Sequence, residues 1–305
     1  MGTPEFALPS LKALLAAGAP ILLVVTQPDR PKGRGRRVMA SPVKQLAQSR
    51  GLPVYQPERV RSPEAVARIA GLEPTCIVVV AYGQLLPASI LELPPLGAVN
   101  VHASLLPKYR GPAPIHWALL SGESETGITT MLMDAGMDTG KILLQRELSI
   151  QPNETAGSLH DRLSQEGAQL LVETLELLKR GALEPKAQEK SEGTYAPMLT
   201  SEDGRVDWGD DARKICLRIR GLDPWPGAFT QWQTKKLKLF GCRPLSLSTL
   251  AEPGTVIRAD EEGLQVAAGQ GAVLIEALQL EGRRPLAVAD FLRGNSLQVE
   301  TKLGE

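Results

Sequence analysis

Short aliphatic runs alternate with amphipathic stretches over the first 180 residues of the chain. The runs at 21–26 and 75–80 are continuously apolar and rich in β-branched residues, which is typical of strands buried on both faces. Further strands are predicted at 53–55 and 98–101. Helices are predicted around these runs, at 6–17, 42–50, 63–70, 87–91 and 113–120. Strands separated by helices indicate an α/β fold, a Rossmann-like doubly wound parallel sheet.

A long helix is predicted at 155–180, and the pattern of apolar residues changes after it. Residues 181–197 have little apolar periodicity and mix proline, glycine and charge, which indicates a linker. Short candidate strands separated by turn residues then follow, at 237–240, 254–257, 264–267 and 272–275. This spacing is typical of a small β-barrel. The sequence therefore predicts a first domain over 1–181, a linker over 182–200 and a β-barrel domain over 201–305.

Composition and charge exclude several classes of protein. With 43% hydrophobic and 22% charged residues in 305, the chain has the balance of a soluble globular protein. Lys and Arg together equal Asp and Glu at 34 each, so a polyanion could be bound only by a local patch. No aliphatic run approaches the roughly 20 residues of a membrane span. The three cysteines fit neither a disulfide framework nor a zinc site, which favours a reduced cytoplasmic protein.

The segment Gly97-Ala98-Val99-Asn100-Val101-His102-Ala103-Ser104 carries the first candidate chemistry. Side chains alternate in a strand, so Val99 and Val101 face one way and Asn100 and His102 the other. An amide and an imidazole would then project together at the carboxyl end of a strand, where open α/β sheets bind ligands. The alternative is that Asn100 caps a local turn and His102 is an ordinary hydrogen-bonded residue.

Two loops downstream add candidates. Residues 104–114 combine positive side chains, a hydroxyl and a rigid Pro/Gly frame just before a helix, an arrangement that suits anions. Residues 133–140 form a glycine-bounded loop with two carboxylates, Asp134 and Asp138. A carboxylate beside an imidazole can orient it or relay a proton, although Asp next to Gly is also a common turn former.

A third loop is strongly basic. Between residues 26 and 37 one acid, Asp29, stands against five basic residues: Arg30, Lys32, Arg34, Arg36 and Arg37. Residues 205–243 carry nine basic residues against four acidic ones. Two basic islands in a neutral chain are consistent with a long polyanionic substrate that touches both, while a merely solvated loop is the alternative.

Taken together, these motifs resemble the folate-dependent formyltransferases. The resemblance rests on Asn100-Val101-His102, on 104–111 and on Asp134-Ala135-Gly136-Met137-Asp138-Thr139-Gly140. Further segments are similar to the branch of that family that formylates methionyl-tRNA: 26–31, 33–35, 41–44, 81–83, 85–87 and 223–227. The match runs nearly end to end.

The resemblance implies transfer of a formyl group from 10-formyltetrahydrofolate to the α-amino group of initiator methionyl-tRNA, for translation initiation. It matches Asn100, His102 and Asp138 to the family's catalytic trio. It assigns the reduced folate to Ser104, Leu105, Leu106 and Pro107, and the pteridine pocket to Tyr82, Gly83, Leu85 and Leu86. The basic loop would grip the acceptor stem, and an OB-type barrel in the second domain would support the tRNA. The chemistry requires no metal, and a monomer is expected.

Other functions remain open at this point. Glycinamide ribonucleotide formyltransferases share the trio but lack the second domain, and sugar-amine formyltransferases lack the basic loop in this form. A third alternative is a non-catalytic folate- or RNA-binding relative.

The beginning of the sequence departs from the family pattern. Met1-Gly2-Thr3-Pro4 resembles the turn after a first strand, yet no strand precedes it. The neighbouring strands should then have unpaired backbone groups. Two hypotheses follow: Met1 is a late start, or the protein is a weakened version of the enzyme.

Overall fold

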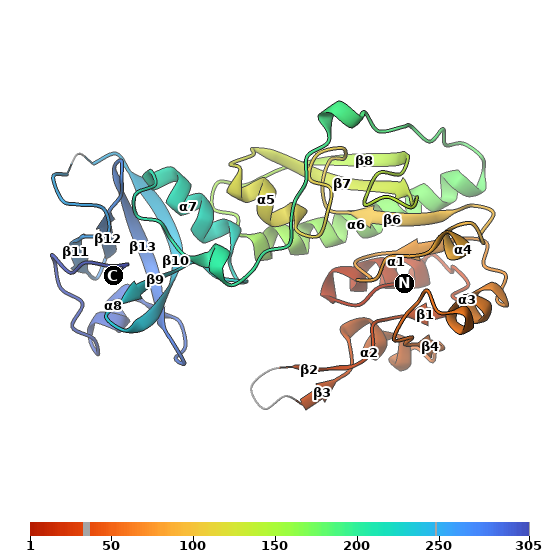
Figure 1. Cartoon of the computed structure of the whole chain (residues 1–305), viewed down its shortest axis with the longest axis horizontal. Coiled ribbons are helices and arrows are strands. Elements are labelled where there is room, and N and C mark those ends of the chain that lie inside the picture. Colours follow the sequence, from red (N-terminus) through yellow and green to blue (C-terminus); the bar gives the residue numbers. More distant parts are fainter. Residues whose placement is uncertain (33–36, 248, 305) are drawn as a thin grey trace. The chain divides into compact units, whose positions relative to one another are not determined.

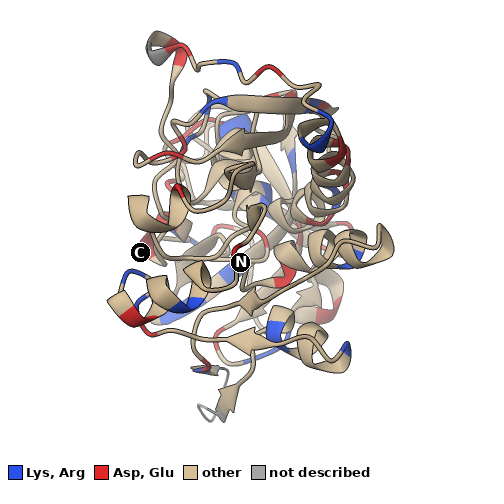
Figure 2. Ribbon diagram, turned by 90° about the vertical axis from the view of Figure 1, so that its right-hand side faces the viewer, with Lys and Arg blue, Asp and Glu red and all other residues tan. Residues whose placement is uncertain are grey.

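The structure is a computed structural model that describes residues 1–32, 37–247 and 249–304. It divides into two compact units (Figure 1). Unit 1 comprises Met1–Pro114, Glu125–Ser149 and His160–Ala196, and unit 2 comprises Ile115–Ser124, Ile150–Leu159 and Pro197–Glu305. Within the described ranges, no helix is both long and apolar enough to span a membrane. Lys and Arg are interspersed with Asp and Glu along the ribbon (Figure 2).

Unit 1 is built around parallel strands, which confirms the predicted α/β class. Strand β1 (Val24–Val25) pairs in parallel with β4 (Val54–Tyr55), and β5 (Ile77–Val79) pairs in parallel with β6 (Ala98–His102). The sheet then continues with antiparallel strands β7 (Glu125–Leu132) and β8 (Ile142–Ser149). These two strands were not predicted. In β7, Thr129 and Thr130 interrupt the apolar pattern although both side chains are fully buried, and in β8 the polar run at 145–147 interrupts it.

The predicted helices of unit 1 are present, with local signals at their starts. They are α1 (Leu8–Ala16) after a short turn η1 (Glu5–Ala7), α2 (Pro42–Ser49), α3 (Pro63–Ala70), α4 (Ala88–Leu91) and α6 (Ala156–Lys179), whose first residues belong to unit 2. The hydroxyl oxygens of Ser41 and Ser62 each accept a hydrogen bond from a backbone N–H in the first turn of the following helix, at 3.2 Å. Proline follows each cap, so these helices begin where the sequence predicts.

Met1 and Gly2 lie between the two parallel pairs. The Met1 amino group donates to the Val78 carbonyl at 2.6 Å, and Gly2 N donates to the Val25 carbonyl at 3.0 Å. Burial lowers the pKa of this amino group to about 6. The Val80 N–H donates to the Met1 carbonyl at 2.9 Å. These two residues therefore make the strand-like connection between β1 and β5.

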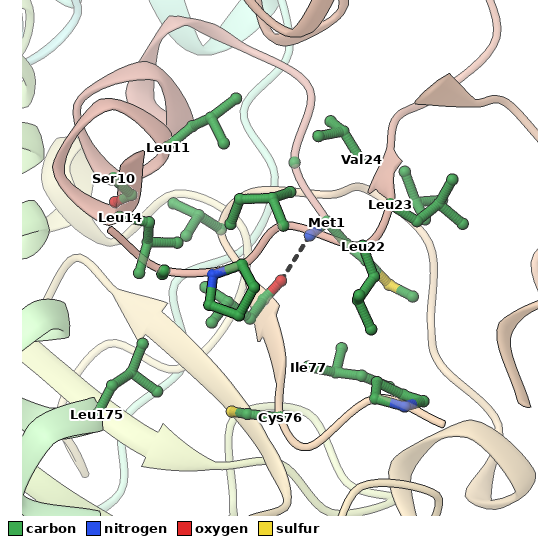
Figure 3. A pocket seen from close by; sticks show the side chains of 18 of the residues that line it. Met1, Ser10, Leu11, Leu14, Leu22, Leu23, Val24, Cys76, Ile77 and Leu175 are labelled. Atoms are coloured by element: carbon green, nitrogen blue, oxygen red, sulfur yellow. Dashed lines mark hydrogen bonds between the residues drawn. The ribbon is translucent and has the colours of Figure 1, made fainter. Parts of the chain in front are cut away.

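A cavity of about 510 Å³ lies beside Met1, between the segments that lead into β1 and β5 (Figure 3). Its lining is mostly aliphatic and includes Leu11, Leu14, Leu23 and Ile77. Burial here raises the pKa of the Cys76 thiol to about 11. Only Val24 and Val25 of the strand predicted at 21–26 form a strand, Thr26 N adds a hydrogen bond to the Tyr55 carbonyl at 3.1 Å, and Leu22 is half exposed.

Unit 2 contains an antiparallel sheet over a separate core, as predicted for the second domain. Its strand order is β11 (Val256–Asp260), β12 (Gly263–Ala267), β13 (Ala272–Leu280), β10 (Lys235–Leu245) and β9 (Phe229–Trp232), with β14 (Leu286–Ala287) beside β13. Among described residues the named strands form an open path with β11 and β9 at its ends rather than a closed barrel. Helices α5 (Pro114–Leu120), α7 (Ala212–Gly221) and α8 (Val288–Leu292) complete the unit.

A disulfide joins Cys216 of α7 to Cys242 of β10. The expectation that the cysteines are unpaired is therefore wrong for these two. Their separation of 26 residues gives no signal by itself, and the helix and strand that carry them come together only in the folded core. Cys76, in unit 1, is a free thiol.

The cavity beside Met1 predicts a stability effect. Six apolar, β-branched residues placed before Met1 should occupy it, pair with β1 and β5 and bury several side chains, for a net gain of about 3 kcal/mol. The melting temperature should then exceed that of a chain with six Gly and Ser residues at the same place by roughly 6–12 °C in calorimetry. Equal melting temperatures for the two extensions would contradict this interpretation of the cavity.

Candidate functional site

Strand β6 carries Asn100 and His102 to one end of the sheet of unit 1. The strand lies between β5 and β7, and all five of its residues are buried. Asn100 pairs with Met131 and His102 with Thr129 on the antiparallel neighbour. Strand alternation therefore places both polar side chains on one face, with 9% and 6% of their surface exposed.

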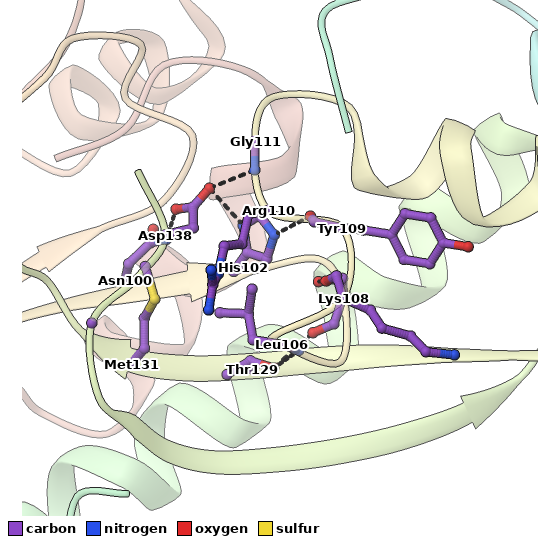
Figure 4. Close-up of polar contacts among 12 residues, drawn as sticks. Asn100, His102, Leu106, Lys108, Tyr109, Arg110, Gly111, Thr129, Met131 and Asp138 are labelled. Carbon is purple, nitrogen blue, oxygen red and sulfur yellow. Dashed lines mark hydrogen bonds and ion pairs between the residues drawn. The ribbon is translucent and has the colours of Figure 1, made fainter. Parts of the chain in front are cut away.

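The Asp138 carboxylate lies against both side chains (Figure 4). Asn100 Nδ2 lies 3.5 Å from Asp138 Oδ1, and His102 Nδ1 lies 3.7 Å from Asp138 Oδ2. The backbone N–H of Gly111 also donates to Oδ2, at 2.8 Å. Asp138 has a φ of +54°, a left-handed conformation that few non-glycine residues adopt. The structure thus brings the three residues together on a carboxylate held by an unusual turn.

Both ring nitrogens of His102 face oxygen atoms. Nε2 lies 2.9 Å from the carbonyl oxygen of Tyr109, which can only accept, so Nε2 carries a hydrogen. Nδ1 faces the Asp138 carboxylate, and a proton that reaches Nδ1 would lie against that carboxylate. The ring is therefore oriented from both sides, with its second nitrogen turned toward a group that can accept a hydrogen bond.

The stretch at 104–107 is fixed by its own polar contacts. The Ser104 hydroxyl donates to the Lys108 carbonyl at 2.6 Å. Thr129 Oγ1 donates to the Ser104 carbonyl at 2.7 Å and accepts from Leu106 N at 3.1 Å, while Gln145 Nε2 donates to the Leu106 carbonyl at 2.8 Å. Leu105 is partly exposed, whereas Leu106 is buried. The segment is therefore a preformed wall next to the trio.

The loop at 82–86 divides into buried and exposed positions. Tyr82 and Leu86 belong to the hydrophobic core of unit 1, and burial raises the pKa of the Tyr82 hydroxyl to about 12. Gly83 is exposed, with a φ of +89°, and 75% of Leu85 is exposed. Only Gly83 and Leu85 of the four predicted pocket residues are therefore open to a ligand.

Family models match almost the whole chain. One described as formyl transferase matches residues 2–175, and one described as formyl transferase, C-terminal domain, matches residues 198–296. The chain belongs to the formyltransferase family. A methionyl-tRNA formyltransferase of Geobacter sulfurreducens is 52% identical over 305 residues, which cover 100% of this chain and 96% of the relative.

Solved structures share the formyltransferase fold at lower identity. The N-formyltransferase of Helicobacter canadensis, in complex with folinic acid and dTDP-3-aminofucose, is 17% identical with a TM-score of 0.65, covering 90% of this chain and 96% of that one. HypX of Aquifex aeolicus, in complex with tetrahydrofolic acid, is 22% identical with a TM-score of 0.60, covering 81% of this chain and 43% of that one. At these identities the likeness shows the fold alone.

The basic loop of this formyltransferase family member is partly described. Strands β2 (Arg30–Lys32) and β3 (Arg37–Met39) pair as an antiparallel hairpin, and Arg34 and Arg36 lie outside the described residues. At its base, Asp29 lies 2.5 Å from Lys44 Nζ and accepts from Gln56 Nε2 at 2.7 Å. These contacts hold the pKa of Asp29 below its usual range. Asp29, the residue before β2, is therefore held in place by Lys44 and Gln56.

One segment beside the site of this formyltransferase family member was not predicted from the sequence. Residues 186–196, within the stretch interpreted as a linker, belong to unit 1 and pair with the loop at 107–113. The Arg110 N–H donates to the Thr194 carbonyl at 2.9 Å, and the Ala196 N–H donates to the Arg110 carbonyl at 2.7 Å. Because this pairing uses backbone groups, it does not require a periodic pattern of apolar residues, and the sequence therefore does not reveal it.

Proposed function

We propose that the protein transfers the formyl group of 10-formyltetrahydrofolate to the α-amino group of initiator methionyl-tRNA. The observation that carries this proposal is the convergence of Asn100, His102 and Asp138 at the end of β6, in a chain 52% identical to a methionyl-tRNA formyltransferase over its full length. The product, N-formylmethionyl-tRNA, would serve translation initiation. A cytoplasmic monomer is part of the proposal.

The trio supports acyl transfer to an amine. A neutral amine attacks the formyl carbon and gives a tetrahedral intermediate with a developing oxyanion. The Asn100 amide can donate to that oxygen, and such a donor contributes about 3 kcal/mol in the transition state. His102, with Asp138 at Nδ1, can stabilise the same oxygen and help a proton reach the departing folate nitrogen once its Nε2–H exchanges the Tyr109 carbonyl for the substrate. These steps need no metal.

For the folate we propose the surface formed by residues 104–107 together with Gly83 and Leu85. The family resemblance assigns eight residues to the folate. Four of them are exposed or partly exposed: Gly83, Leu85, Leu105 and Pro107. Tyr82, Leu86, Ser104 and Leu106 are buried and would act by shaping the backbone.

For the tRNA we propose the β2–β3 hairpin and unit 2 as contact regions. Arg30, Lys32, Arg34, Arg36 and Arg37 would contact phosphates, which supplies affinity and position rather than base recognition. We propose residues 1–181 as the catalytic domain, 182–200 as a connection that also borders the site, and 201–305 as the tRNA-binding domain of OB type.

A sugar amine is the second candidate acceptor. The fold over 90% of this chain is shared with the Helicobacter canadensis N-formyltransferase, which was solved with dTDP-3-aminofucose, so this acceptor class is included in the test. The basic hairpin favours tRNA over a nucleotide sugar, since a single small diphosphate needs fewer cations.

A comparison of acceptors tests the proposed function. With 10-formyltetrahydrofolate as donor, the purified protein should formylate charged initiator tRNA at least a hundredfold more efficiently, in kcat/KM, than glycinamide ribonucleotide or dTDP-3-aminofucose. Product mass spectrometry identifies the formylated amine. A preference for either small acceptor, or no transfer to any of the three, would overturn the proposal.

Removing either polar side chain of β6 should abolish turnover. Asn100→Ala and His102→Ala should each reduce kcat by a factor on the order of a hundred or more, since each removes stabilisation of the oxyanion. Folate affinity, measured by fluorescence titration, should change little. His160→Ala is the matched control, because His160 lies in α6 outside the trio and should retain activity. Wild-type rates in either Asn100 or His102 variant would refute the assignment.

The basic loop should govern the salt dependence of tRNA binding. Replacing Arg34 and Arg36 by Gln should weaken binding and reduce the slope of log K against log salt by about 2, one for each phosphate that is no longer neutralised. The control changes two exposed arginines elsewhere, Arg61→Gln with Arg180→Gln, at the same net charge. If both double variants have the wild-type slope, the loop does not contact phosphate.

A further inference from the structure

Residues 186–196 are tied to both loops that border the trio. The N–H and the carbonyl of Lys186 pair with the carbonyl and the N–H of Ile142, at 2.9 and 2.8 Å, just after the Asp138 loop. At the other end of the segment, the Thr194 hydroxyl accepts from Tyr109 N at 2.8 Å. Gly111 is held close to the segment, since a Cβ there would lie 2.7 Å from Tyr195 and 2.8 Å from the Ala196 carbonyl.

Gln188 lies between these two anchors and uses both ends of its amide. Its Nε2 donates to the carbonyls of Asp138 and Gly140, at 2.9 and 2.7 Å. Its Oε1 accepts from Nε and Nη2 of Arg110, at 3.0 and 2.7 Å. The two hydrogens and the oxygen of the amide are thus satisfied by the two loops that carry Asp138 and Gly111. Gln188 therefore joins these loops, beside the direct bond from Gly111 N to Asp138 Oδ2.

The position of Asp138 depends on holding these loops in strained conformations. Asp138 and Tyr109 have φ values of +54° and +59°. Such conformations persist when surrounding contacts fix them. The carbonyl of Asp138 is fixed by Gln188, and its carboxylate is fixed by Gly111 N at 2.8 Å. Besides a 4.0 Å contact of Nε2 with Met131 Sδ, the bonds of the Gln188 amide go to backbone carbonyls and to Arg110, so its main effect on Asn100 and His102 passes through Asp138.

We propose that Gln188 is a positioning residue, which holds the Asp138 carboxylate against Asn100 and His102 by joining the Asp138 backbone to Arg110. This inference rests on the proposed function for its kinetic consequence, while the geometric part stands without it. Misplacement of a catalytic group by about 1 Å can cost a hundredfold in rate. The substrate-binding surfaces at 83–85 and 104–107 include none of the bonds that Gln188 makes.

Three variants separate the roles of this side chain. Gln188→Leu removes the donors and the acceptor at similar size. Gln188→Glu keeps the acceptor for Arg110 but places a carboxylate beside two carbonyl oxygens. Glu189→Gln, next along the same segment and exposed, is the matched control. Melting temperatures of all three should lie within a few degrees of wild type.

The kinetic readout is kcat against KM for both substrates. Both Gln188 variants should lose roughly tenfold to a hundredfold in kcat, with each KM within about threefold, and Glu189→Gln should match wild type. A loss carried by KM alone, or a kcat within twofold of wild type in Gln188→Leu, would overturn the proposal.

Amide hydrogen exchange gives a readout that needs no activity. In Gln188→Leu the Gly111 N–H should exchange at least tenfold faster, because its acceptor on Asp138 is released, while the Ile142 N–H should remain protected by Lys186. If the wild-type protein does not formylate methionyl-tRNA, the proposed function fails, and this exchange experiment still decides the role of Gln188. Unchanged protection of Gly111 overturns it.

Discussion

The site depends on one carboxylate that is held from several directions. Asp138 accepts from Gly111 N, lies beside the Asn100 amide and faces the His102 ring. Asn100 and His102 are nearly buried, and buried polar side chains are stabilising only when they have partners. Without Asp138, the Asn100 amide and the His102 Nδ1 would both lose the carboxylate that lies beside them. The left-handed conformation of Asp138 belongs to the loop that supplies this neighbour.

The strand that carries Asn100 and His102 could be predicted from the sequence, but the role of the loop at 133–140 could not. Alternation along 98–102 places Asn100 and His102 on one face, and the structure agrees. The choice between Asp134 and Asp138 could not be made from composition, since each precedes a glycine by two residues. In the structure, Asp134 Oδ1 accepts from Gly136 N and Thr139 Oγ1, as a turn former does. Only the family resemblance selected Asp138 in advance.

Other parts of the structure have no signal in a single sequence. Residues 186–196 contact the site loops through backbone groups and the Gln188 amide, so their apolar period is absent and they resemble a linker. Cys216 and Cys242 pair because a helix and a strand meet in the core of unit 2. Strand β7 was missed for a related reason, since buried threonines such as Thr130 satisfy their hydroxyls internally and resemble exposed positions in the sequence.

Tyr82 is matched to the family's binding pocket, but its side chain is buried. Its backbone carbonyl accepts from Thr3 Oγ1 at 2.9 Å and from Gln27 Nε2 at 3.3 Å, which fixes the turn before Gly83. Its ring lies in the core, and its hydroxyl has no hydrogen-bond partner in the described part of the chain. The ring therefore fills space, and the turn it anchors presents Gly83 and Leu85. A buried aromatic residue can thus be needed for a binding surface that it does not itself form.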